Sequence, residues 1–231
     1  MRPAAACELE LILAVDVSGS VNAKEYRLQS RGLADAFRSE DIIHLIHQTS
    51  RRGAVYVTLL QWSGSPHQKQ MIGWQHLHDK ASVLAFAERI ETSPREFINY
   101  STAIGEMMAF AGGLFDQRPG RCRRRVVDVS GDGPKNEGRE VAPARERLLQ
   151  SDVTINGLAI IGEEEELAGY YRSEVIGGNG AFMMTAETFN DFPDAIRRKL
   201  LREIAPPITE LAPSARRQAN LEPCPTERRS C

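Results

Sequence analysis

The chain has 231 residues and a formal net charge of −2. This length can bury a sizeable core in one α/β domain with residues to spare. The near-neutral charge gives no reason to expect nucleic acid or an anionic membrane as a partner. No apolar run in the sequence approaches the roughly 18 residues of a membrane span.

The first predicted strand ends in a group of oxygen-bearing side chains. Leu9 to Asp16 is apolar without alternation, which is typical of a strand buried on both faces. Asp16 ends the run, and Ser18 and Ser20 follow at alternate positions in a short turn. Open α/β sheets bind ligands at the carboxyl ends of their strands. Such oxygen ligands favour Mg²⁺, Mn²⁺ or Ca²⁺ over zinc or copper.

Helices and strands alternate along the rest of the chain. Asn22 and Glu25 have the spacing of a capping box and predict the start of a long helix, with a break near Ser39. This alternation predicts an α/β fold, with a doubly wound, mostly parallel six-stranded sheet, one antiparallel edge strand and flanking helices. The later strands are expected at 54–63, 67–74 (the antiparallel edge), 124–130, 153–160 and 181–185. The later helices are expected at 80–91, 102–115, 140–150 and 187–204. The acidic run 163–166 is expected to lie in the first turn of a helix.

Three segments together resemble the metal-ion-dependent adhesion site of von Willebrand factor A (vWA) domains. The first is Asp16-Val17-Ser18-Gly19-Ser20, the second is Ser101-Thr102-Ala103-Ile104-Gly105, and the third ends a central apolar strand at Ser130-Gly131-Asp132-Gly133. In the second segment the resemblance favours Thr102 over Ser101. The alternative interpretation is that these hydroxyls and carboxylates only cap loops and helix ends.

The resemblance implies a metal site and a function. Family members usually bind the ion directly through the hydroxyls, with one or both aspartates acting through water. An ion with mostly neutral ligands stays electrophilic and favours one more anionic oxygen, such as an Asp or Glu carboxylate of a partner protein. We therefore expect a non-enzymatic, metal-dependent protein-binding module that holds Mg²⁺, or Mn²⁺ or Ca²⁺. The implied ligands are Asp16, Ser18, Ser20, Thr102 and Asp132.

Two other functions stay open. One is a vWA-like scaffold whose site is empty. The other is a Mg²⁺-dependent phosphatase that uses Asp16 as nucleophile, as haloacid-dehalogenase-like enzymes do after a similar strand. Those enzymes carry a second Asp two residues further on, where this chain has Ser18. Without a proton donor there, departure of the leaving group is poorly assisted.

The likeness extends over roughly residues 7–204 to a bacterial vWA-type family of unknown function. Its members are generally predicted to be secreted or periplasmic. Residues 1–6 are interpreted as the remnant of a secretory signal peptide, or else as a short cytosolic start. Residues 205–231, rich in Pro and Arg, are expected to form a flexible tail. The segments that carry the likeness are 14–21, 25–26, 61–63, 128–133, 176–178 and 195–200.

Cys7 and Cys122 precede the first and the central strand at similar distances. If those strands are parallel neighbours, as the resemblance implies, a disulfide between them is geometrically reasonable. Cys224 and Cys231 could form a second one. Two disulfides would indicate the periplasm or secretion, whereas four reduced cysteines would indicate the cytoplasm.

Asp128 interrupts the central apolar strand, where an unpaired carboxylate is costly. We expect a structural carboxylate that is satisfied by hydrogen bonds, to neighbouring loops or to a group near the site, rather than a metal ligand.

Overall fold

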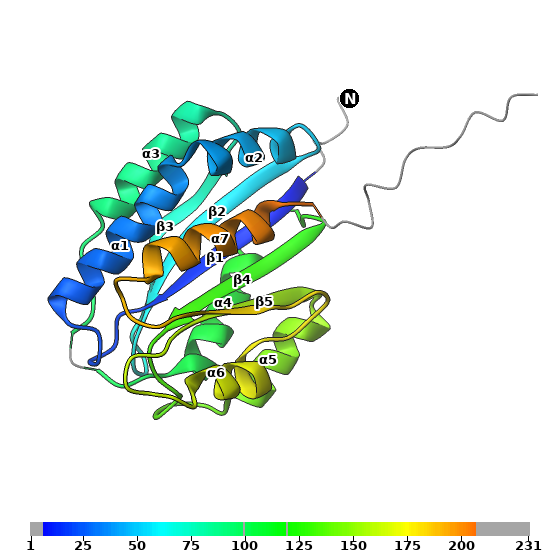
Figure 1. The fold of residues 1–231 in the computed structure, drawn as a ribbon. Coiled ribbons are helices and arrows are strands. Elements are labelled where there is room, and N and C mark those ends of the chain that lie inside the picture. The colour runs from blue at the N-terminus through cyan, green and yellow to red at the C-terminus, as the bar shows by residue number, and fades with distance from the viewer. Residues whose placement is uncertain (1–6, 99, 119, 207–231) are drawn as a thin grey trace, which may run out of the picture.

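The computed structural model describes residues 7–98, 100–118 and 120–206 (Figure 1). The expected signal-peptide remnant (1–6), nearly all of the expected tail (205–231) and the Cys224–Cys231 pair lie outside these residues.

A single six-stranded sheet runs through the described part of the chain, in the order β3-β2-β1-β4-β5-β6. Neighbouring strands are parallel except for β2 and β3, which pair antiparallel at one edge. The expected fold class is therefore confirmed. The strands are β1 (Cys7–Asp16), β2 (Ala54–Trp62), β3 (Gln68–Leu77), β4 (Arg124–Gly131), β5 (Val153–Ile160) and β6 (Met183–Ala186).

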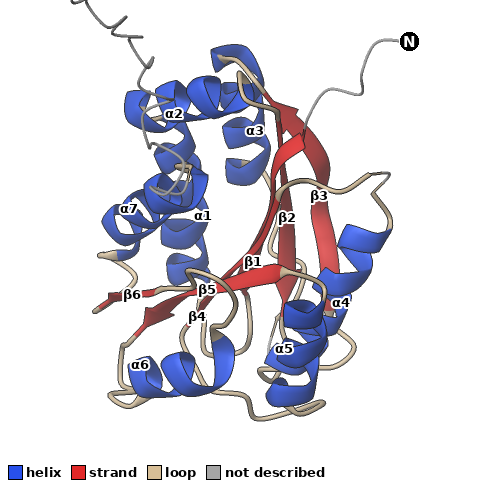
Figure 2. Ribbon diagram, turned by 90° about the vertical axis from the view of Figure 1, so that its right-hand side faces the viewer, coloured by secondary structure: helices blue, strands red, loops and turns tan. Residues whose placement is uncertain are grey.

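Helices cover both faces of the sheet, which Figure 2 shows nearly edge-on. One face is covered by α1 (Ala23–Arg38), α2 (Glu40–Ser50), α3 (Lys80–Glu91) and α7 (Phe192–Ile204). The other face is covered by α4 (Ile104–Asp116), α5 (Val141–Gln150) and α6 (Leu167–Tyr170), and α6 continues into a π-helical turn, Tyr171–Val175. No helix in the described ranges is both long and apolar enough to cross a bilayer.

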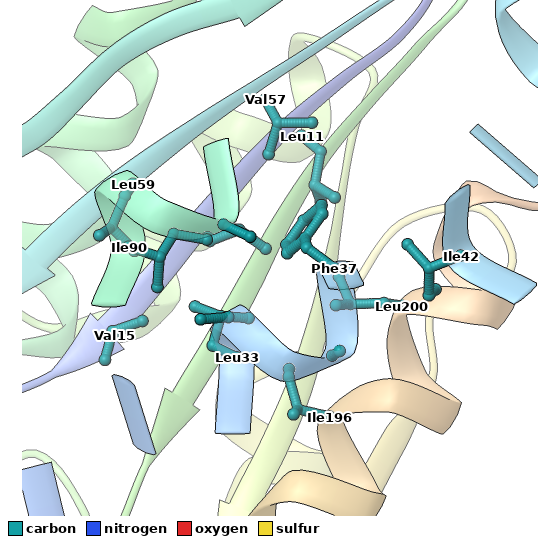
Figure 3. Packing of buried hydrophobic residues seen from close by; sticks show 14 of the residues in the cluster. Leu11, Val15, Leu33, Phe37, Ile42, Val57, Leu59, Ile90, Ile196 and Leu200 are labelled. Atoms are coloured by element: carbon teal, nitrogen blue, oxygen red, sulfur yellow. The ribbon is translucent and has the colours of Figure 1, made fainter. Parts of the chain in front are cut away.

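β1 is apolar at Leu9 and from Leu11 to Val15 because it lies between these two layers. Alternate residues from Leu9 to Val15 pack toward the α1 side, whereas Ile12 and Ala14 pack toward the α4 side. In Figure 3, Leu11 lies in one cluster with Phe37 of α1. Because both faces of β1 are covered, its residues from Leu11 to Val15 are apolar at successive positions rather than only at every second one.

The capping box at the start of α1 is confirmed. The Asn22 side chain accepts hydrogen bonds from the backbone N–H groups of Lys24 and Glu25, and the Glu25 side chain accepts one from the Asn22 N–H at 2.7 Å. α1 ends at Arg38, and Ser39 is both its C-cap and the N-cap of α2, so the expected break is present.

Two predictions near the carboxyl end of the domain were wrong in detail. The acidic run Glu163–Glu166 lies in turns before α6 and not in a helical first turn. The last helix begins at Phe192 rather than at residue 187, because the Asp191 carboxylate accepts hydrogen bonds from the backbone and hydroxyl of Thr188. These contacts hold the preceding residues in a turn.

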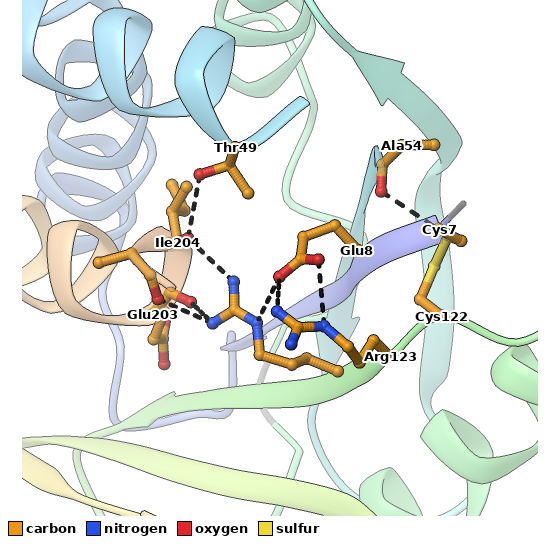
Figure 4. A network of polar contacts seen from close by, with 10 residues as sticks. Cys7, Glu8, Thr49, Ala54, Cys122, Arg123, Glu203 and Ile204 are labelled. Carbon is orange, nitrogen blue, oxygen red and sulfur yellow. Dashed lines mark hydrogen bonds and ion pairs between the residues drawn. A yellow bond between two sulfur atoms is a disulfide. The ribbon is translucent and has the colours of Figure 1, made fainter. Parts of the chain in front are cut away.

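A disulfide joins Cys7 to Cys122, as expected, with a Cα–Cα distance of 4.4 Å. Beside it, Glu8 is buried and pairs with Arg123 at 2.6 Å and with Arg124 at 3.6 Å (Figure 4). Arg124 also donates to three carbonyl groups at the carboxyl end of α7. A cation at this helix end complements the helix dipole. The amino ends of β1 and β4 are therefore fastened to each other and to α7.

Candidate metal-binding site

The candidate site lies where β1 and β4 end side by side. The two strands pair in parallel from Leu9 opposite Arg124 to Val15 opposite Ser130. After β1 the chain enters α1 on one face of the sheet, and after β4 it enters α5 on the other. In open α/β sheets, such divergence marks the place at the carboxyl ends of the strands where ligands bind.

Four of the five expected ligands form one chain of side-chain contacts. The Ser20 hydroxyl donates to Oδ1 of Asp132 at 2.7 Å. The Oγ atoms of Ser18 and Ser20 are 3.2 Å apart, and the Thr102 Oγ1 is 3.4 Å from the Ser18 Oγ. The structure thus brings together residues that are more than a hundred positions apart in the sequence.

Asp16 is the fifth expected ligand, and one of its carboxylate oxygens has no hydrogen-bond partner. Its side chain is fully buried, and Oδ1 accepts a hydrogen bond from the Ser18 N–H at 2.8 Å. Oδ2 is buried without a hydrogen-bond partner. Burial, together with the nearby charge of Asp132, raises the pKa of Asp16 to about 8. Burial also raises the pKa of Asp132. The two carboxylates would both be stabilised by a cation between them.

The donor set fits a hard divalent cation. It consists of two carboxylates and three hydroxyls, and Mg²⁺, Mn²⁺ and Ca²⁺ prefer such oxygen ligands. Within the described residues, no cluster of three or more His, Cys, Asp or Glu side chains is found, so the softer donor sets typical of structural zinc are not present there.

Tyr171 lies beside Asp16 and was not predicted from the sequence. Its side chain is fully buried, and its hydroxyl has no hydrogen-bond partner. A Cβ atom placed on Gly131 would lie 2.6 Å from the Tyr171 hydroxyl and 2.9 Å from Oδ2 of Asp16. Burial and the charge of Asp16 raise the pKa of Tyr171 well above its ordinary value. The missing side chain at Gly131 is therefore what lets Tyr171 approach the carboxylate.

We expect Gly131→Ala to lower the free energy of unfolding by about 1–3 kcal/mol, as overpacked core positions do. The added methyl group would overlap two buried polar atoms that cannot move into solvent. Gly133→Ala is the matched control, because its Cβ would come no closer than 3.9 Å to its nearest neighbour, Oγ1 of Thr102. Urea denaturation of both variants tests this, and equal stability losses would contradict it.

The loop that carries Thr102 is fixed by contacts that the sequence did not reveal. The Thr102 N–H donates to Oδ1 of Asn136 at 2.8 Å, and the Asn136 N–H donates back to the Thr102 carbonyl at 3.0 Å. The Arg95 guanidinium donates to the carbonyls of Val17 and Ser18 at 3.0 and 2.8 Å. The segments after β1, β4 and α3 are thereby joined around the site.

The geometry separates Thr102 from its alternative, Ser101. Thr102 is buried and its hydroxyl contacts Ser18, whereas Ser101 is exposed. Asp128 lies outside the site and instead contacts Lys199 of α7, with Nζ at 2.5 Å from Oδ1. It is buried and paired, as expected for a structural carboxylate.

A family described as "Protein of unknown function (DUF1194)" matches residues 6–208. The chain belongs to this family. No curated protein sequence matches this DUF1194 chain.

Solved structures show that the fold of this DUF1194 chain is of the vWA type. It is similar to proximal thread matrix protein 1 from the mussel byssus, described "with zinc occupied MIDAS motif", at 18% identity and a TM-score of 0.59, covering 85% of this chain and 46% of that one. It is also similar to a von Willebrand factor type A protein from Catenulispora acidiphila, at 16% identity and a TM-score of 0.57, covering 86% of this chain and 43% of that one. For BatB from Bacteroides thetaiotaomicron the identity is 20% and the TM-score 0.52, covering 84% of this chain and 98% of that one. This chain therefore spans less than half of the first two proteins.

Proposed function

We propose that this DUF1194 protein is a divalent-metal-dependent protein-binding module whose site accepts a carboxylate from a partner protein. The observation that carries the proposal is Asp16, which is fully buried with Oδ2 unpartnered and with a raised pKa. A buried carboxylate in this state is unfavourable by itself. A cation bound beside it would offset that cost.

Each residue would have a definite part in holding Mg²⁺, Mn²⁺ or Ca²⁺. Asp16 and Asp132 supply negative charge, while Ser18, Ser20 and Thr102 supply neutral oxygens. With only two carboxylates, a divalent ion is at most neutralised, and fewer than six protein side chains contribute oxygen. Octahedral Mg²⁺ has room for a further ligand under these conditions. An Asp or Glu carboxylate of a partner would fill this remaining coordination position with an anionic oxygen.

Binding suits this site better than phosphoryl transfer. A nucleophilic aspartate has to reach its substrate, and Asp16 is fully buried below Ser18. Two residues further on, Ser18 offers a hydroxyl rather than a carboxylic acid. An empty scaffold is the other alternative, and it predicts that no metal binds.

Thr102→Val is expected to abolish metal-dependent capture of acidic peptides. The variant keeps the shape of the side chain and removes the hydroxyl next to Ser18. A displayed peptide library would be bound in Mg²⁺ and eluted with EDTA, and the eluted peptides should be enriched in Asp or Glu. Mn²⁺ affinity, measured by titration calorimetry, should fall at least about tenfold, since even the loss of an outer-shell contact can do this.

Ser101→Ala is the matched control, because it removes a neighbouring but exposed hydroxyl. It should keep both Mn²⁺ affinity and peptide capture. Replacing the selected Asp or Glu of a peptide by Asn or Gln should abolish capture. Peptides that stay bound in EDTA, or wild-type protein that binds no Mn²⁺, would contradict the proposal.

We further propose that the protein acts outside the cytoplasm, in the periplasm or after secretion. The Cys7–Cys122 disulfide supports this location, because such bonds persist in oxidising compartments.

A further inference from the structure

A second group of buried ionisable side chains lies between β4, β5 and α7, separate from the metal-binding site. Lys199 Nζ is 2.5 Å from Oδ1 of Asp128 and 2.6 Å from Oε1 of Glu203. All three side chains are at most 2% exposed. Asn156 donates to Oε1 of Glu203 at 2.9 Å and accepts from the Phe182 N–H at 3.0 Å, so the Glu203 carboxyl is held in place.

The charges of this cluster do not balance if every group is ionised. Two carboxylates and one ammonium would leave a net negative charge in the core, which is unfavourable. Burial, with the charge of Asp128 adding to it, raises the pKa of Glu203 to about 8, so Glu203 carries a proton at neutral pH. A Lys199 ammonium beside an Asp128 carboxylate holds the same number of protons as a neutral amine beside a carboxylic acid. Transfer of one proton across the 2.5 Å contact therefore supplies both reacting forms without an outside acid or base.

The contact between Lys199 and Asp128 suits attack on carbon. Although Nζ is 2.5 Å from Oδ1, neither Asp128 oxygen accepts a hydrogen bond of normal geometry. A carboxyl C–O bond is about 1.2 Å long, so Nζ lies within about 3.7 Å of Cγ. This separation is close to the 3–3.5 Å of near-attack geometries, which give intramolecular reactions a large advantage.

We propose that Lys199 and Asp128 condense into an intramolecular amide bond that joins α7 to β4, with Glu203 as the catalytic acid and base. The Lys199 amine forms the Nζ–Cγ bond. Glu203 donates its proton to the departing Asp128 hydroxyl, which leaves as water when its C–O bond breaks. The Glu203 carboxylate then takes a proton from Nζ and returns to its initial state. One amine and one carboxylic acid thus give one amide and one water, and no oxidant or cofactor is consumed.

Glu203 is placed for this role and Asn156 is a positioning residue. Oε1 of Glu203 lies 2.6 Å from the attacking nitrogen, so it can exchange a proton with it directly. The Asn156 side-chain amide donates a hydrogen bond to the same Oε1 atom at 2.9 Å. Asn156 also has a carboxamide, however, and attack there would release ammonia instead of water. The mass of the product therefore identifies the electrophile.

Intact mass spectrometry of the purified full chain tests the proposal. The disulfide is first reduced and alkylated, so that it does not contribute to the difference. The wild-type mass should be lower by one water molecule than the mass calculated for the alkylated sequence. Tandem mass spectrometry of a digest should find one branched peptide that joins the segments around Lys199 and Asp128.

Two variants separate the chemistry from a merely structural ion cluster. Lys199→Met removes the nucleophile, and Glu203→Gln keeps both reacting groups while removing the acid and base. Both should have the full sequence mass, whether or not they fold well. Lys80→Arg is the matched control, because Lys80 pairs with Glu40 at 2.7 Å on the surface, and it should keep the loss of water.

The branched peptide is sought in wild-type protein, so poor folding of a variant does not affect it. A wild-type chain of full sequence mass, with an unmodified Lys199 peptide, would overturn the proposal. Loss of ammonia with a link to Asn156 would overturn the assignment of Asp128. A Glu203→Gln chain that still loses water would overturn the role of Glu203.

Discussion

Mg²⁺ or Mn²⁺ is expected to stabilise the wild-type domain against unfolding, and Asp16→Asn is expected to remove this response. A ligand that binds only the folded state at 100 times its Kd adds about 2.7 kcal/mol to the free energy of unfolding. The ion would offset the burial of Asp16 and Asp132, whose pKa values are both raised by burial. Urea denaturation in EDTA and in excess metal measures the difference.

The order of stability should reverse without metal. Asn at position 16 has no charge to bury, so in EDTA the variant should be at least as stable as the wild type. The matched control is Asp116→Asn, which changes an exposed aspartate at the carboxyl end of α4 and should keep the metal response. A wild-type domain whose stability is the same in EDTA and in metal would contradict the prediction. So would an Asp16→Asn variant that responds fully.

Removing the Cys7–Cys122 disulfide is expected to lower the free energy of unfolding by about 4–5 kcal/mol, the value for a loop of about a hundred residues in the chain-entropy model. The two cysteines are 115 positions apart, so the bond restricts a large part of the unfolded chain. Cys7→Ser/Cys122→Ser tests this in urea denaturation, with reducing agent as a second arm. The reducing agent should destabilise the wild type and leave the double variant unchanged.

Metal affinity should survive this change. β1 runs over ten residues from Cys7 to Asp16, so the disulfide and the candidate site are roughly 30 Å apart along the strand. Mn²⁺ titration of the folded double variant provides the control. A loss of stability below about 1 kcal/mol would contradict the entropic account of the bond.

The fold could be predicted from local patterns because its strongest signals are local. The apolar runs of β1, β2 and β5 mark strands covered on both faces, and Asn22 with Glu25 marks the start of α1. The start of α7 was harder to predict from the sequence. It depends on hydrogen bonds from Thr188 to the Asp191 carboxylate, which compete with the helical pattern of the surrounding residues.

The candidate site was predictable only where its residues lie at a strand end or just before a helix in a recognisable spacing. Asp16, Ser18, Thr102 and Asp132 are such residues, and the structure brings their segments together. Tyr171 belongs to a π-helical turn with no clear periodicity, and its position depends on the absent side chain of Gly131. Tertiary packing alone brings it to Asp16.

The cluster around Lys199 could not be predicted from the sequence, for a different reason. Lys199 and Glu203 are four residues apart on a helix, which is the usual spacing of an exposed ion pair. Only the packing of α7 against β4 and β5 reveals that both are buried beside Asp128. From the sequence, Asp128 indicated only that its carboxylate needs a polar or charged partner, because it interrupts an apolar strand.

The edges of the sheet limit how another protein can approach it. β6 has only four residues, and the pairing of β3 with β2 shifts register at two points. Short or irregular edges are poor templates for adding a foreign strand. Strand addition is therefore disfavoured at both edges of the described sheet, which is consistent with the proposal that a partner docks at the loops around Asp16 and Asp132 instead.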